Sequence, residues 1–198
     1  HSAYLNLLWH DPTVKPRPPR PLPILRHFTD QDIAFLRSGW NGRESVLAFK
    51  CGPHSGHHNL QYTQNVSGGH MHPMAGAIAL FAHGDFLLVE SGYPRKKTIC
   101  ENTLLVNGHG QIGEGVDWFE DLEFRRGHAT PRMIEVGSRK GVDYAIGDAT
   151  AAYLPAARLK RFIRRVYRLS PDAWLIDDDV EAARPSTFTL LFHGDQPL

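Results

Sequence analysis

Short apolar runs separated by turn-forming residues restrict the fold of this chain more than any other feature. Runs of four to eight apolar residues bounded by Gly, Pro, Asn or Asp are typical of strands. They predict strands at residues 33–37, 46–50, 77–82, 86–91, 103–106, 142–148, 162–169, 173–179 and 187–193. No segment sustains a helical period over three turns, although residues 154–165 could hold a short helical piece. Many short strands at regular spacing predict an all-β fold, a two-layer antiparallel β-sandwich.

A proline-rich stretch marks the domain boundary. Residues 11–23 contain six prolines, and such a segment is extended and semi-rigid. We therefore expect residues 1–29 to be the end of a preceding domain followed by a linker. Residues 30–198 should form the sandwich. The apolar start of the chain, His1 to Trp9, suggests that the sequence begins within a longer protein.

The overall charge gives little support for a nucleic-acid partner, because the formal net charge is only +1. Basic residues do cluster between 158 and 168, and Asp177, Asp178 and Asp179 follow. The basic cluster could meet an acidic substrate, but a solvated strand face is the more probable interpretation. No apolar run is long enough to span a membrane. Two cysteines, Cys51 and Cys100, are too few for a disulfide scaffold, and their pairing stays open.

Two histidines in the segment Gly69-His70-Met71-His72-Pro73 suggest chemistry. Pro73 favours extended geometry at His72, and residues two apart in an extended segment share a face. Two imidazoles on one face suit a zinc site or proton transfer. The alternative is a polar loop that is rich in histidine by chance, since the chain has 12.

The motifs that follow these histidines resemble a known family. Ser91-Gly92-Tyr93 ends a predicted strand, and residues 102–108 read Asn-Thr-Leu-Leu-Val-Asn-Gly. Together with His70, His72 and Gly76, this order resembles the C-terminal β-sandwich of heparinase II/III-like polysaccharide lyases, which include oligoalginate lyases. The resemblance covers nearly the whole chain. It implies a sandwich of the supersandwich type, preceded in the full protein by a helical (α/α) toroid domain that this chain lacks.

The resemblance also implies a metal site, with departures from the family pattern. The family's ligand positions fall on His72, Glu90 and Glu101, where the family has His, Asp and His. Met74 stands where the family has an aspartate after the two histidines. One imidazole and two carboxylates can bind zinc. A site that accepts Mn or Ca, or no metal at all, stays open.

In this family the reaction is β-elimination of uronic-acid-containing polysaccharide. A base removes the C5 proton, and an acid protonates the leaving 4-oxygen. His70 matches the active-site histidine and is the expected catalytic residue, as base or as neutraliser of the uronate carboxylate. The remaining groups come largely from the helical domain, so this chain alone should be inactive. Its partners would be an acidic polysaccharide or oligosaccharide and its own N-terminal helical domain, in a secreted or periplasmic setting.

Three further residues are candidates for substrate binding, each with a structural alternative. Tyr93 could face the cleft, or pack in the core with its hydroxyl in water. His193 lies on a strand that the family places near the cleft, or is a buried hydrogen-bonded histidine. His58 could approach substrate or cap a loop. His128 is an alternative to Glu101 as metal ligand, although a surface histidine is the more probable interpretation.

Two other functions stay open at this stage. The substitutions at Met74, Glu90 and Glu101 favour a carbohydrate-binding or structural sandwich that has lost catalysis. A cupin-like metal enzyme is the second alternative, because cupins also combine two closely spaced histidines with a downstream glutamate.

Overall fold

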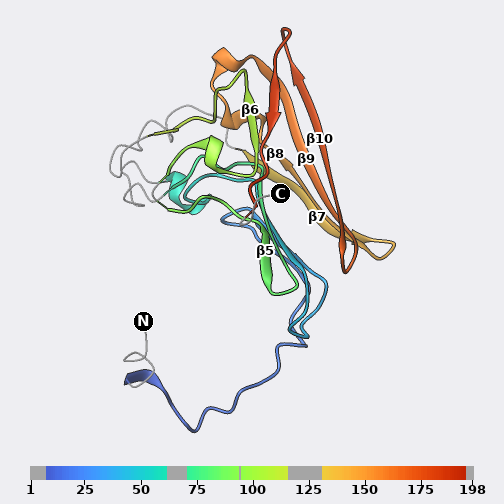
Figure 1. Ribbon diagram of the computed structural model, residues 1–198. Coiled ribbons are helices and arrows are strands. Elements are labelled where there is room, and N and C mark those ends of the chain that lie inside the picture. The colour runs from blue at the N-terminus through green and yellow to red at the C-terminus, as the bar shows by residue number, and fades with distance from the viewer. Residues whose placement is uncertain (1–7, 62–70, 94, 116–130, 195–198) are drawn as a thin grey trace.

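The computed structural model describes residues 8–61, 71–93, 95–115 and 131–194, and its elements are strands and short 3₁₀ turns (Figure 1). The strands are β1 (Leu25–Phe28), β2 (Ile33–Arg37), β3 (Val46–Lys50), β4 (Ala77–Ala82), β5 (Asp85–Leu88), β6 (Leu104–Val106), β7 (Arg132–Arg139), β8 (Val142–Asp148), β9 (Leu159–Ser170), β10 (Ala173–Ala182) and β11 (Phe188–Leu190). The 3₁₀ turns are η1 (His58–Gln61), η2 (Thr98–Cys100), η3 (Thr150–Ala152) and η4 (Pro155–Ala157).

The first layer is a five-stranded antiparallel sheet in the order β1-β2-β3-β4-β5. Its central strands alternate between buried and half-buried residues, as expected when one face of a sheet is covered. Ala34 and Leu36 of β2 pair with Phe49 and Leu47 of β3, and all four are fully buried. These side chains form one half of the core.

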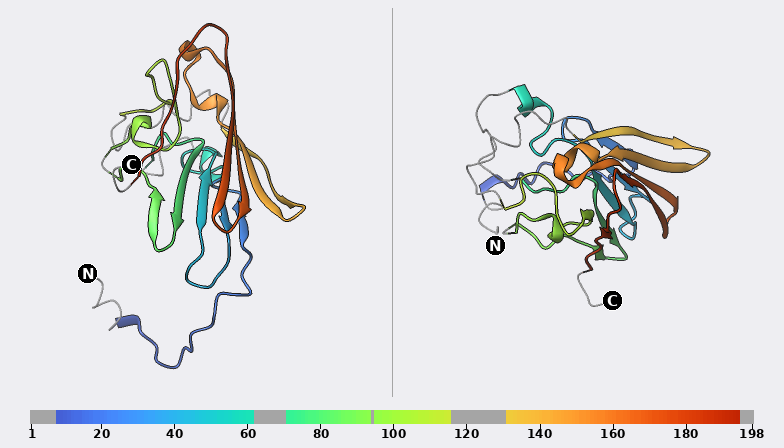
Figure 2. Two further views of the ribbon diagram at one scale, coloured as in Figure 1. Left: turned by 45° about the vertical axis from the view of Figure 1, so that its right-hand side comes forward. Right: turned by 90° about the horizontal axis from the view of Figure 1, so that it is seen from above.

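The second layer is a four-stranded antiparallel sheet in the order β10-β9-β8-β7. Its buried residues Ala145, Phe162 and Val166 belong to the same apolar cluster as those of the first sheet. The short pair β11-β6 adds Leu104 and Val106 to this cluster. The predicted two-layer antiparallel β-sandwich is therefore confirmed, and the further views show the long β9–β10 hairpin beside the first sheet (Figure 2).

Two edge strands and one connection differ from the sequence prediction. β1 and β7 were not predicted, and both lie at sheet edges with mixed polar sequences, where apolar periodicity is weakest. The short helical piece expected in residues 154–165 is confirmed only as the 3₁₀ turn η4. From Leu159 onwards the chain is strand β9, because it pairs with β10 along its length and with β8 between Ile163 and Arg168.

The proline-rich stretch lies outside the sandwich. Residues 8–24 are exposed, and the chain runs from them as an extended arm into β1 (Figure 1). β1 pairs with β2, so the first sheet begins before residue 30. The Trp40 indole N–H donates to the carbonyl of Leu22 at 2.9 Å and ties the end of the arm to the sheet. Within the described residues, no helix has the length and apolar character needed to cross a membrane.

The basic and acidic clusters neutralise each other across the β9–β10 hairpin. Arg161 pairs with Asp179 and Arg165 with Asp177 on the outer side. Arg164 pairs with Asp178 inside the sandwich. The cluster is therefore a set of cross-strand ion pairs rather than an unbalanced cationic surface for an acidic ligand.

Candidate functional site

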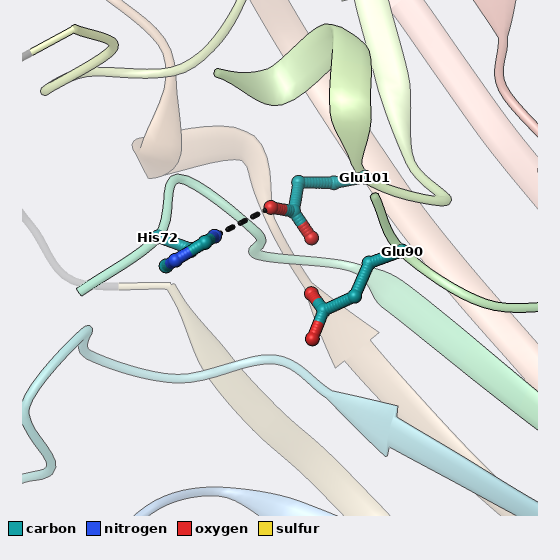
Figure 3. Close-up of side chains that lie close together, drawn as sticks. All are labelled: His72, Glu90 and Glu101. Carbon is teal, nitrogen blue, oxygen red and sulfur yellow. Dashed lines mark hydrogen bonds and ion pairs between the residues drawn. The ribbon is translucent and has the colours of Figure 1, made fainter. Parts of the chain in front are cut away.

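The structure brings the three predicted metal ligands together (Figure 3). His72 lies in the segment before β4, Glu90 follows β5, and Glu101 follows η2. One potential ligand atom from each residue lies within 4.8 Å of the others. Irregular segments outside the strands therefore bring an imidazole and two carboxylates close together.

Burial makes Glu101 the electrostatically costly member of this cluster. Glu101 is only 1% exposed to solvent. Its Oε1 shares a hydrogen bond of 2.9 Å with Nδ1 of His72, whereas Oε2 has no hydrogen-bond partner in the described structure. Burial, followed by the adjacent carboxyl of Glu90, raises the pKa of Glu101 to about 9. The raised pKa favours the protonated carboxyl at neutral pH when no cation is bound.

The residues of the cluster fit a divalent cation. The buried Oε2 of Glu101, which has no hydrogen-bond partner in the described structure, is available to a cation, and the exposed Glu90 adds a second carboxylate. Nitrogen and oxygen donors of this kind suit zinc, and the carboxylates also suit harder cations. Met74 lines a cavity of about 210 Å³ beside Glu90 and Glu101, and its thioether supplies no carboxylate there.

His54 supports His72 and was not found by sequence reasoning. It hydrogen-bonds to the backbone of His72 and of Ile112. Burial and the charge of Lys50 lower the pKa of His54 to about 4, so its imidazole is neutral at physiological pH. No local motif marks this residue, because its neighbours in space come from two distant segments.

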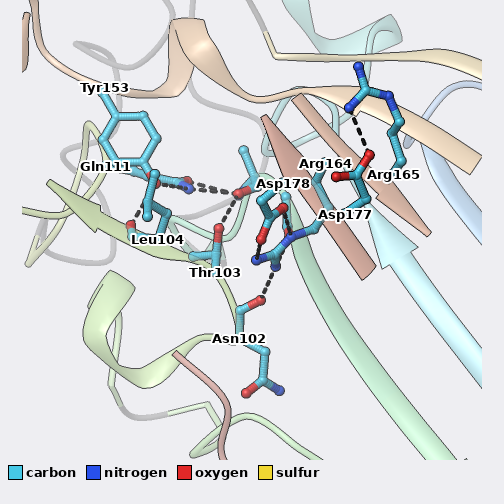
Figure 4. A network of polar contacts seen from close by, with 11 residues as sticks. Asn102, Thr103, Leu104, Gln111, Tyr153, Arg164, Arg165, Asp177 and Asp178 are labelled. Carbon is cyan, nitrogen blue, oxygen red and sulfur yellow. Dashed lines mark hydrogen bonds and ion pairs between the residues drawn. The ribbon is translucent and has the colours of Figure 1, made fainter. Parts of the chain in front are cut away.

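A buried polar network fixes the segment between His72 and β4 (Figure 4). The amide of Gln111 accepts from the backbone N–H of Ala75 at 2.8 Å and donates to its carbonyl at 2.7 Å. Thr103 Oγ1 donates to the same carbonyl at 2.8 Å. Tyr153 adds a hydroxyl that donates to the carbonyl of Leu104. Satisfied buried networks of this kind rigidify the backbone around them.

The candidate substrate-binding residues have different surroundings. The Tyr93 ring lies 6.3 Å from the His72 ring, and Tyr93 is 44% exposed. The His193 ring hydrogen-bonds to Oδ1 of Asn102, the residue that follows Glu101. The backbone N–H of His58 donates to Asp30, in the turn between β1 and β2, at 2.7 Å. The contacts of Tyr93 and His193 thus connect with the cluster, whereas this contact of His58 does not.

The candidate histidines His70 and His128 lie outside the described residues. Cys51 and Cys100 are buried free thiols and form no disulfide with each other. Burial raises the pKa of Cys51 to about 12, which keeps it in the unreactive thiol form.

Comparison with known proteins agrees with this architecture. The sequence family described as heparinase II/III-like, C-terminal, matches residues 20–197. A heparan sulfate lyase from Pedobacter heparinus gives a TM-score of 0.56 and 16% identity, over 82% of this chain and 23% of its own. Two heparinase III structures give TM-scores of 0.66 and 0.61 with 12% and 13% identity, over 90% and 87% of this chain and 25% of theirs. The chain spans about a quarter of the length of these structures, and it belongs to the heparinase II/III-like C-terminal domain family.

Proposed function

We propose that this chain is the C-terminal domain of a polysaccharide lyase that cleaves uronic-acid-containing polysaccharide or oligosaccharide by β-elimination. The family match over residues 20–197 carries this proposal. The convergence of His72, Glu90 and Glu101 supports it, because these residues occupy the positions expected for the family's metal ligands. One of the similar structures is itself a heparan sulfate lyase.

The proposed chemistry assigns His70 to the reacting sugar. β-Elimination needs a base at C5, an acid at the leaving 4-oxygen, and neutralisation of the uronate carboxylate. His70 stands two residues before His72 and serves as base or as carboxylate neutraliser. Tyr93, half-exposed beside the His72 ring, would contact the substrate, and its exposure and nearness to His72 support this role. The N-terminal helical domain supplies the remaining groups in a secreted or periplasmic lyase.

We also propose that His72, Glu90 and Glu101 hold a divalent cation, with zinc as the first choice. A bound cation would balance the buried charge of Glu101 and hold the segment that follows His70. The imidazole of His72 contributes a nitrogen donor, and its neighbour His54 holds its backbone in place. Glu90, at the exposed side of the cluster, faces the solvent through which a cation would enter.

The decisive experiment uses the full-length lyase together with this 198-residue chain. The lyase reaction is followed by the absorbance of its unsaturated uronate product at about 235 nm, where a conjugated enol carboxylate absorbs. We expect His70→Ala in the full-length protein to lose roughly 10²–10⁴-fold in kcat, as expected for the loss of a general base. The chain alone should show no turnover. Full activity of the variant removes His70 from the mechanism, and turnover by the chain alone refutes the need for a second domain.

A non-catalytic carbohydrate-binding sandwich is the second candidate. It is favoured by Met74, Glu90 and Glu101, which replace three residues of the family pattern. Binding of uronate polysaccharide by the full-length protein without any product at 235 nm would select this candidate. The family assignment leaves no support for the cupin-like alternative.

A further inference from the structure

Arg164 of β9 is a fully buried arginine that bonds to three separate parts of the chain. Its Nε and Nη2 donate to the two carboxylate oxygens of Asp178 at 2.7 and 2.8 Å. Its Nη1 donates to the carbonyls of Gly76 and Asn102, both at 2.8 Å. Figure 4 shows the guanidinium between the β9–β10 hairpin and Asn102. A buried charge of this kind is strongly held, because every bond it makes is shielded from water.

The two carbonyls belong to the segments that carry the cluster residues. Gly76 lies four residues after His72, and Asn102 directly follows Glu101. One nitrogen of one guanidinium therefore joins the segment that carries the imidazole to the segment that carries the buried carboxylate.

The geometry of the guanidinium makes this link rigid. The group is planar, and its N–H donors point in fixed directions. Asp178 binds one edge of the plane and so fixes the orientation of Nη1. The positions of the two carbonyls are then set by β9 and β10, strands that contribute no residue to the cluster.

We propose that Arg164 is a positioning residue that holds His72 and Glu101 at hydrogen-bond distance and so sets the affinity of the cluster for a cation. The part that concerns the cation rests on the proposed function. The part that concerns the His72–Glu101 pair rests on their bond of 2.9 Å and on the bonds of Arg164 to Gly76 and Asn102.

Arg168 provides a matched control within the same strand. It lies four residues further along β9, on the same face, and both its Nε and its Nη2 donate to Asp143, which is buried. The bonds described for Arg168 do not reach residues 72–76 or 101–103. Removing either arginine thus breaks a buried ion pair in the same sheet, but only Arg164 is bonded to the cluster segments.

The test compares Arg164→Gln with Arg168→Gln in the 198-residue chain. Zinc affinity is measured by competition with a chelator, and the imidazole of His72 is followed by NMR without metal. We expect Arg164→Gln to weaken zinc binding roughly 10–100-fold, as loss of outer-shell partners does, and to shift the His72 ring signals. Arg168→Gln should change affinity less than about 3-fold and leave those signals in place.

The outcomes separate this inference from the metal proposal. A wild-type chain that binds no zinc refutes the metal site, while the NMR comparison still tests the positioning role. Unchanged His72 signals in Arg164→Gln, or an equal change in Arg168→Gln, overturns the inference. If Arg164→Gln does not fold, the apolar pair replacement R164M/D178L is compared with R168M/D143L, because such replacements often preserve stability.

Discussion

Replacing Glu101 with glutamine should stabilise the metal-free protein and destabilise the metal-loaded one. The free carboxyl titrates near 4.5 when unfolded, whereas in the fold its pKa is raised to about 9 by burial and by Glu90. A raised acid pKa means that the folded state keeps a proton that the unfolded state releases. Stability contributed by this proton is complete below pH 4.5 and is lost as the pH rises towards about 9.

The size of this effect follows from the titration interval. Neutral pH lies about 2.5 pH units above the unfolded pKa, and each unit is worth about 1.4 kcal/mol, so the cost at pH 7 has an upper limit of about 3.5 kcal/mol. Glutamine has the same shape and does not titrate. We therefore expect Glu101→Gln to raise the free energy of unfolding at pH 7 by about 1–3 kcal/mol without metal. The free energy of unfolding of the wild type should decline between about pH 5 and 8, and this decline should be absent in the variant.

Urea unfolding with a chelator, and then with zinc, measures both halves of this prediction. Zinc at 100 times its Kd for the wild type should stabilise the wild type by about 2.7 kcal/mol. The same zinc concentration should stabilise Glu101→Gln much less. Glu90→Gln is the control, because Glu90 is exposed. Glu90→Gln removes only the part of the raised Glu101 pKa that Glu90 causes, so it should stabilise the metal-free protein less than Glu101→Gln does. It also loses a proposed zinc ligand. A Glu101→Gln variant less stable than wild type without metal, at pH 7–8, would refute the reasoning.

Three shorter predictions concern the site and the core. His72→Ala should abolish zinc retention in elemental analysis, and unchanged metal content would remove His72 from the ligand set. Phe49→Ala should cost about 3–5 kcal/mol in urea unfolding with little change in the slope, because Phe49 is fully buried between the sheets. Asp178→Asn should cost about 3–5 kcal/mol at pH 7, because it leaves the buried guanidinium of Arg164 without its anion. A loss below about 1 kcal/mol in either stability measurement would contradict the packing described above.

The sequence predicted the interior of the sandwich better than its edges. The predicted spans of β2, β3, β4 and β8 agree with the structure, because each has an apolar run bounded by turn residues. β1 and β7 carry too few apolar residues to show a period of two, and they become strands by pairing with a formed neighbour. Tertiary pairing likewise extended β9 into the segment where a helical piece was predicted.

In the candidate site, too, some residues could be identified from the sequence and others only from the structure. The family resemblance assigned the ligand positions His72, Glu90 and Glu101, and the structure brings these residues together. The contacts of His54 and Arg164 could not, because each depends on segments that meet only in the folded sandwich. The bonds of Arg164 to Gly76 and Asn102 cross 88 and 62 residues of sequence.

The substitutions in the cluster have a physical consequence for the kind of cation that the proposed site would hold. Two carboxylates and one imidazole carry more negative charge than two imidazoles and one carboxylate, and Glu101 is deeply buried. Without metal, burial favours the protonated form of Glu101, and a cation that binds there would displace this proton. Metal affinity should consequently rise with pH between the neutral range and pH 9. Carboxylate-rich donors also narrow the preference for zinc over harder cations such as manganese.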